Sequence, residues 1–95
     1  MKPRRVVITG VGALTPIGNT LEEYWNGLIN GKSGAAPITY FDSSKFKTHF
    51  ACELKDFDPL NFFDRKEVRK YDRFTQYALV STNEAIIDSG IDLSK

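Results

Sequence analysis

Cys52 and His49 are the residues with the strongest potential chemistry, because a thiol activated by an imidazole is a common arrangement for covalent catalysis. Both lie in the segment His49-Phe-Ala-Cys-Glu-Leu54, whose residue types predict a short β-strand. On a strand, an odd spacing of three places the two side chains on opposite faces, so the geometry does not favour a catalytic dyad. Two ligands also fall short of the three or four that a zinc site uses. We expect Cys52 to be buried in packing and His49 to lie at the surface, with no catalytic or metal-binding residue here.

A basic cluster is the most informative group in the chain. The segment Arg65-Lys-Glu-Val-Arg-Lys70 contains Lys66, Arg69 and Lys70 at spacings i, i+3 and i+4. At about 100° per residue, these three cations share one side of a short helix, with Arg65 and Arg73 near its margin. Such a side is either a solvated charged face or a docking site for an acidic partner. Nucleic acid is a weaker alternative, because no interleaved aromatic residues accompany the cluster.

Two glycine-containing segments suggest phosphate binding but lack its context. After Thr9-Gly-Val-Gly12, the third glycine of a dinucleotide-binding fingerprint would fall at Thr15, and Pro16 follows in place of a helix. The segment Gly27-Leu-Ile-Asn-Gly-Lys-Ser33 is one residue too short between its glycines and follows a predicted helix. We interpret the first segment as a tight turn and Gly31 as a helix C-cap. The sequence therefore predicts no cofactor.

Composition excludes several classes of protein. The chain has 95 residues, of which 41% are hydrophobic and 26% charged, which is typical of a globular domain. Its 13 Lys and Arg and 12 Asp and Glu give a net charge of +1, too balanced to direct the whole molecule to nucleic acid or a membrane. No apolar run approaches the roughly 20 residues of a membrane helix, and the opening lacks the apolar core of a secretory signal. We expect a cytoplasmic location, with which a single cysteine agrees.

Two strands are predicted among the elements that position these groups. Residues 5–9 form a short β-branched apolar run, which is typical of a central strand buried on both faces, and residues 49–54 form the second strand. Residues 32–47 between them are loop-like. Because two strands alone make a marginal sheet, the sequence predicts a piece of a larger α/β unit with no internal domain boundary.

Three helices are predicted from their capping residues. Thr20 and Glu23 form a capping box for a helix over about residues 21–30. Asp64 with Glu67 repeats this signature for a helix over about residues 65–70. Asp72 can cap a longer helix that runs to Ser89, where Gly90 provides the stop. This last helix has one charge between residues 74 and 87 and many small residues, so we expect it to be packed on most sides.

Six segments of the chain follow one another in a distinctive order and spacing. They are Arg4-Arg-Val-Val-Ile-Thr-Gly-Val-Gly12, Leu14-Thr-Pro-Ile-Gly-Asn19, Gly31-Lys-Ser-Gly34, Phe41-Asp42, Arg65-Lys-Glu-Val-Arg-Lys70 and Asp72-Arg-Phe-Thr-Gln-Tyr77. Together they resemble the amino terminus of bacterial β-ketoacyl-acyl-carrier-protein synthases, closest to type II. The resemblance covers essentially all 95 residues. Related polyketide ketosynthases stay open as an alternative.

The resemblance implies a fold and an activity for the complete protein. The fold would be thiolase-like, with duplicated α/β halves in α-β-α-β-α layers and usually a homodimer, and residues 1–95 would be an incomplete amino-terminal part of the first half. In that family an acylated cysteine and two histidines carry out decarboxylative condensation with malonyl-carrier protein. All three lie beyond position 95 in the family pattern, and neither Cys52 nor His49 matches them. The chain alone is therefore expected to be inactive.

The resemblance also implies a partner. Lys66, Arg69 and Lys70 match family positions that contact an acidic helix of acyl carrier protein, which bears the phosphopantetheine-linked acyl chain. Exposed ion pairs contribute only about 0–1 kcal/mol each, so the cluster would orient the partner more than hold it. The alternative is a non-catalytic fragment whose binding face for an acidic partner is its one intact property. No nucleic-acid or membrane partner is expected.

Overall fold

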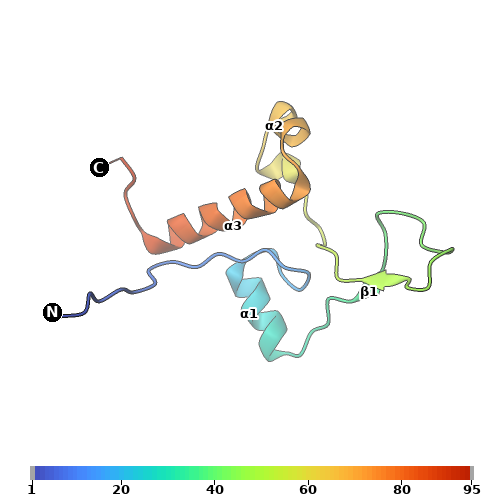
Figure 1. Cartoon of the computed structure of the whole chain (residues 1–95), viewed down its shortest axis with the longest axis horizontal. Helices are drawn as coiled ribbons and strands as arrows, with labels where there is room; N and C mark the ends of the chain where they lie inside the picture. The colour runs from blue at the N-terminus through green and yellow to red at the C-terminus, as the bar shows by residue number, and fades with distance from the viewer. Residues whose placement is uncertain (1, 95) are drawn as a thin grey trace.

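The computed structural model describes residues 2–94 as three α-helices, a short 3-10 helix and a small hairpin (Figure 1). In chain order the elements are α1 Leu21–Ile29, β1 Ala36–Pro37, β2 Phe50–Ala51, η1 Pro59–Asn61, α2 Arg65–Lys70 and α3 Arg73–Ser89. The molecule is elongated, with the hairpin projecting at one end and both termini towards the other (Figure 1). No helix among the described residues is long and apolar enough to cross a bilayer.

The amino-terminal segment runs beside α3 without joining a sheet (Figure 1). The predicted central strand over residues 5–9 is therefore wrong for this chain, and Val6 is 88% exposed. The physical reason is that the two described strands pair with each other in a hairpin at the far end of the molecule, so no described strand lies beside this segment (Figure 1).

Close backbone contacts hold the next residues against α3. A Cβ atom on Gly12 would overlap the carbonyl oxygen of Ser81, so a side chain cannot fit at this crossing. The carboxylate of Glu84 accepts hydrogen bonds from the amides of Ala13 (2.8 Å) and Leu21 (3.0 Å). Glu84 therefore holds both ends of the loop that precedes α1, and this loop positions the start of that helix.

α1 begins and ends almost as the sequence predicts. The Thr20 hydroxyl accepts a hydrogen bond from the amide of Glu23 (3.2 Å), while the Glu23 carboxylate accepts from the amide of Asn19 (2.8 Å) and not from that of Thr20. Gly31 has φ +66°, and the Lys32 amide donates to the carbonyl of Gly27 at 2.8 Å. This is the glycine-dependent helix stop that the sequence predicts, although α1 ends at Ile29.

The hairpin is shorter than the predicted strand. β1 and β2 are antiparallel, with Ala36 opposite Ala51 and Pro37 opposite Phe50. β1 lies inside the stretch predicted to be loop, and Pro37 limits the ladder because it has no amide hydrogen. Cys52 is exposed, so its predicted burial is wrong, because the two-residue strands do not form a covered sheet face.

The predicted boundaries of α2 (Arg65–Lys70) and α3 (Arg73–Ser89) are confirmed. The Asp64 carboxylate accepts from the Glu67 amide (2.8 Å), and the Glu67 carboxylate accepts from the Asp64 amide (3.2 Å), which completes the capping box. α3 ends at Gly90, which has φ +70°. Asp72 occupies the N-cap position of α3 but makes no side-chain capping hydrogen bond.

The described residues form no buried apolar core. None of their hydrophobic side chains is buried, and the chain exposes 8113 Å², compared with about 5,500 Å² for a compact protein of this mass. The radius of gyration is 17.2 Å, against about 12 Å for a compact domain of this length. The expectation that α3 is packed on most sides is wrong for this chain, since Phe74 is 73% and Ile87 71% exposed. Apolar side chains at both ends of α3 are thus left without cover by the described residues.

Candidate docking surface

α2 presents the three cations that the sequence singles out. Lys66, Arg69 and Lys70 are all exposed, and we call them together the docking surface. Arg69 and Lys70 lie in the last turn of α2, where positive charge interacts favourably with the helix dipole. The capping box at the other end fixes where the helix begins, so the three cations keep the i, i+3, i+4 arrangement that the sequence predicts.

Gln76 fixes α2 relative to α3. Its side chain is only 4% exposed, and its Nε2 donates to the carbonyls of Val68 (3.3 Å) and Tyr71 (3.1 Å) at the end of α2. The rings of Phe63 and Tyr71 also pack edge to face, with centroids 5.8 Å apart. The docking surface is therefore attached to α3 by two part-buried hydrogen bonds. Nothing in the local sequence marks Gln76 for this role.

Arg73, at the start of α3, is stacked on an aromatic ring from the hairpin loop. Its guanidinium carbon lies 4.7 Å from the centroid of the Tyr40 ring, and its Nη1 donates to the Tyr40 hydroxyl at 3.4 Å. Hydrogen bonding with Tyr77 is the main cause that raises the pKa of both Tyr40 and Arg73. The sequence places Arg73 near the margin of the basic cluster but does not reveal the contact with Tyr40, which is 33 residues away.

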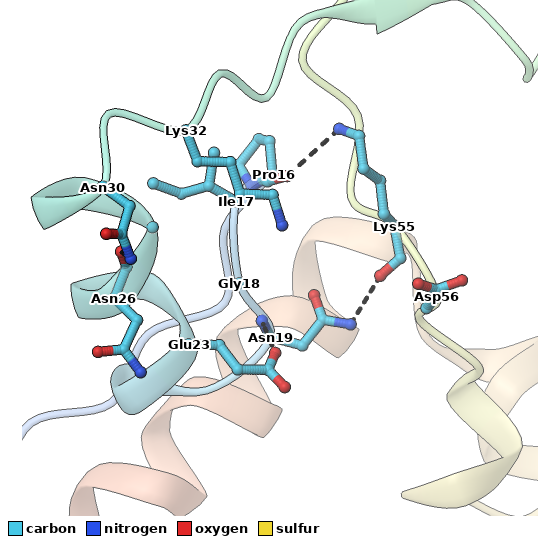
Figure 2. A pocket seen from close by; sticks show the side chains of 11 residues that line it. Pro16, Ile17, Gly18, Asn19, Glu23, Asn26, Asn30, Lys32, Lys55 and Asp56 are labelled. Atoms are coloured by element: carbon cyan, nitrogen blue, oxygen red, sulfur yellow. Dashed lines mark hydrogen bonds between the residues drawn. The ribbon is translucent and has the colours of Figure 1, made fainter.

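A polar hollow of about 640 Å³ lies between α1 and the segment around Lys55 (Figure 2). The Lys55 ammonium donates to the carbonyls of Gly34 (2.7 Å), Glu53 (2.9 Å) and Pro16 (3.2 Å). The Asn19 side-chain amide donates to the Lys55 carbonyl at 2.7 Å, as Figure 2 shows. Because an ammonium has three N–H donors, these bonds use the whole capacity of Lys55. The arrangement joins three segments of backbone and leaves Lys55 no donor for a ligand.

His49 and Cys52 do not form a catalytic pair. His49 is exposed, as predicted, and its Nδ1 lies 2.8 Å from the carbonyl oxygen of Ser43, so this nitrogen carries the proton and donates to the loop backbone. Cys52 is exposed on the other side of β2, just after Ala51, and makes no hydrogen bond to His49. Among residues 2–94, no group of three or more His, Cys, Asp and Glu side chains is placed to hold a metal ion.

Comparison with known proteins defines the class to which this structure corresponds. The N-terminal domain of β-ketoacyl synthases matches residues 3–95, and the chain belongs to this family. Similar curated proteins are the 3-oxoacyl-[acyl-carrier-protein] synthase 2 of Synechocystis sp., 46% identical over 95 residues, and that of Coxiella burnetii, 47% identical over 95 residues. Each alignment covers 100% of this chain and 23% of the relative, so the chain spans about a quarter of their length.

A solved structure has the same arrangement of elements. The ishigamide ketosynthase/chain length factor superposes with a TM-score of 0.86 at 41% identity, over 96% of this chain and 23% of that one. The elongated shape with uncovered apolar faces is therefore also the shape of the matching segment of that longer chain. The thiolase-like fold implied by the sequence resemblance is therefore confirmed in part: the chain has the fold of the amino-terminal part of a ketosynthase domain.

Proposed function

We propose that this chain acts as the amino-terminal part of a type II 3-oxoacyl-[acyl-carrier-protein] synthase, which condenses an acyl thioester with malonyl-carrier protein in fatty-acid elongation. The observation that carries the proposal is identity of 46% and 47% across the whole chain to two such synthases. In the family pattern, the reactive cysteine and the two histidines are supplied by residues beyond position 95. This segment would constitute an incomplete part of the first thiolase-like half of a cytoplasmic homodimer.

The role proposed for α2 is to dock acyl carrier protein through Lys66, Arg69 and Lys70. Two observations support it: these side chains are exposed, and part-buried hydrogen bonds from Gln76 fix their helix. Three cations on one helical side suit an acidic helix, because complementary charge raises the encounter rate and selects the orientation of approach. The carrier protein would thereby be directed so that its phosphopantetheine arm enters the active site.

A ketosynthase of another pathway is the second candidate. It is favoured by the likeness to the ishigamide ketosynthase/chain length factor, at 41% identity. The two candidates share the docking surface and the condensation chemistry, and they differ in the carrier protein that is used. Comparing the rates with a fatty-acid and a polyketide carrier protein under identical conditions distinguishes them.

A chimeric synthase tests the proposal directly. In the chimeric synthase, the 95-residue chain described above replaces the matching 95 residues of the Synechocystis synthase. We expect the chimeric synthase to form 3-oxoacyl product from acyl- and malonyl-carrier protein, measured by mass spectrometry of the products. The matched control carries the corresponding residues of the Coxiella synthase. A folded chimera with no condensation, beside an active control, would contradict the proposal.

Cys52→Ser in the chimeric synthase is expected to leave kcat/KM for condensation within about two-fold of the parent. The physical reason is that Cys52 is exposed just after β2 and has no hydrogen bond to His49, so this imidazole does not activate it. Intact-mass measurement after incubation with acyl-carrier protein should show unchanged acyl-enzyme. Loss of that covalent intermediate in a folded variant would show that Cys52 is a nucleophile.

Gly12→Ala is expected to detach the amino-terminal segment from α3. The added Cβ would overlap the Ser81 carbonyl oxygen, so the backbone must move and the Ala13 amide must leave the Glu84 carboxylate. Overpacking of this kind costs about 1–3 kcal/mol. Hydrogen exchange of the chimeric synthase should become faster at Ala13.

The control for this change is Gly31→Ala, which alters a helix stop with open space around it. It should leave exchange at Ala13 unchanged, although the positive φ of Gly31 makes the substitution locally unfavourable. Unchanged exchange at Ala13 in Gly12→Ala would mean that the close crossing with α3 does not exist in the assembled protein.

A further inference from the structure

We propose that Arg73 is a fourth docking cation, which binds a carboxylate of the acidic carrier protein, and that Tyr40 is the residue that positions it. The proposal rests on the docking function proposed for α2 and extends it to the hairpin loop. Neither residue belongs to the helix that carries Lys66, Arg69 and Lys70. The group that we expect Arg73 to bind is an acidic side chain of a protein partner.

The contact between Arg73 and Tyr40 restricts the rotamers of a long side chain. The guanidinium carbon lies 4.7 Å from the ring centroid, well within the distance of a cation–π interaction, and Nη1 also reaches the Tyr40 hydroxyl at 3.4 Å. Arg73 remains exposed, and a guanidinium has five N–H donors arranged to bind a carboxylate in a bidentate manner. Because Arg73 is exposed, the donors that are not bonded to Tyr40 or Tyr77 can reach a partner.

Tyr40 is itself held in place by the hairpin. The Glu53 carboxylate accepts hydrogen bonds from the Thr39 amide (3.1 Å), the Thr39 hydroxyl (2.9 Å) and the Tyr40 amide (3.3 Å). Desolvation opposes the ionisation of Glu53, but these hydrogen bonds outweigh it and lower the pKa of this carboxyl. The ring of Tyr40 therefore extends from a backbone that an ionised carboxylate fixes at neutral pH.

The position of Arg73 suits the same partner as the docking surface. Arg73 follows Lys70 by three residues, so their Cα atoms are at most about 11 Å apart. The hydrogen bonds from Gln76 to Val68 and Tyr71 also hold the start of α3 against the end of α2. A carrier helix on the docking surface would therefore have Arg73 at one margin. An arginine that is already ordered loses less rotamer freedom on binding than a free lysine, which favours a specific contact.

Four variants of the chimeric synthase test the proposal. The measurement is kcat/KM for carrier-bound substrate divided by kcat/KM for a small acyl thioester, at low ionic strength. Arg73→Ala should lower this ratio about five-fold, which corresponds to about 1 kcal/mol. Arg73→Lys and Tyr40→Leu should each lower it about two- to three-fold, because the charge stays but the stacking is lost. Tyr40→Phe keeps the ring and should restore most of the loss seen with Tyr40→Leu.

Two controls separate docking from general effects. Lys47→Ala removes one exposed cation from the hairpin loop and should leave the ratio unchanged. The double variant Arg73→Ala with Tyr40→Leu should be no worse than Arg73→Ala alone, since Tyr40 acts only through Arg73. An unchanged ratio in Arg73→Ala would overturn the proposal, whether the rates are preserved or fall equally for both substrates. Equal ratios for Tyr40→Phe and Tyr40→Leu would overturn the positioning role.

Two variants separate the role of Arg73 from the role of the cations on α2. If reversal of Lys66, Arg69 and Lys70 lowers the ratio but Arg73→Ala does not, only the extension to Arg73 is overturned. If reversal of all three leaves the ratio unchanged, the docking function proposed for α2 is overturned, and the inference that rests on it falls too.

Discussion

Purified alone, the 95-residue chain is expected to show no cooperative thermal transition. Cooperative unfolding requires a core whose burial outweighs the conformational entropy of about 1–2 kcal/mol per residue. None of the described hydrophobic side chains is buried, and the exposed 8113 Å² exceeds the value for a compact chain of this mass by about 2,600 Å². The strands contain two residues each and cannot supply a stable sheet. The helices would consequently unfold gradually and independently.

Circular dichroism during heating, with light scattering to detect aggregation, measures this prediction. The chain should lose helical signal over a broad temperature range or aggregate, and it should bind a hydrophobic dye at low temperature. The chimeric synthase, in which the same residues gain their covering elements, is the matched comparison and should melt sharply. A sharp melt from a monomeric sample of the isolated chain would show that it folds independently.

The helices could be predicted from the sequence because their determinants are local. Each helix boundary depends on residues within one turn of it, such as Asp64 with Glu67 or the glycine at position 90. The sequence predicts a strand over residues 5–9 that the structure does not contain. A β-branched run indicates that a segment is able to pair with a strand, but not that a partner strand is present. The same applies to the burial of Cys52 and of α3, which depends on elements that the described residues do not provide.

In the candidate site, too, the features that depend on neighbouring residues could be predicted, and the contacts between distant residues could not. The helical spacing of Lys66, Arg69 and Lys70 predicts a shared side, and the structure confirms their exposure. The supporting contacts escaped prediction because they join distant residues: Arg73 lies 33 positions from Tyr40, and the Lys55 ammonium lies 39 positions from the Pro16 carbonyl it contacts. A tyrosine or a lysine in a loop carries no sequence signal for such a contact.

Reversal of the docking surface should have the largest effect on activity. With Lys66, Arg69 and Lys70 all changed to Glu, three attractive interactions with an acidic helix become repulsive. Each exposed pair contributes about 0–1 kcal/mol, and repulsion adds a comparable cost, so we expect kcat/KM for carrier-bound substrate to fall about 10- to 100-fold at low salt. A small acyl thioester needs no docking, so its kcat/KM should change little.

The matched control reverses three exposed cations away from α2, namely Lys2, Lys45 and Lys47. It makes the same change in the net charge of this chain, from +1 to −5, because each Lys→Glu reversal lowers the net charge by two. If general electrostatic attraction were the cause, both triple variants would lose carrier-dependent activity equally. We expect the loss only when the charges on α2 are reversed, since specific docking depends on their arrangement.

The most direct test of the docking account is the ratio of kcat/KM for carrier-bound substrate to kcat/KM for the small thioester, measured in the chimeric synthase across ionic strength. We expect reversal of the three α2 cations to lower this ratio at low salt. The difference from the parent should shrink as salt screens the charges, with a Debye length of about 10 Å at 0.1 M. A ratio equal to that of the parent at every ionic strength would contradict the account and leave Lys66, Arg69 and Lys70 as a solvated face.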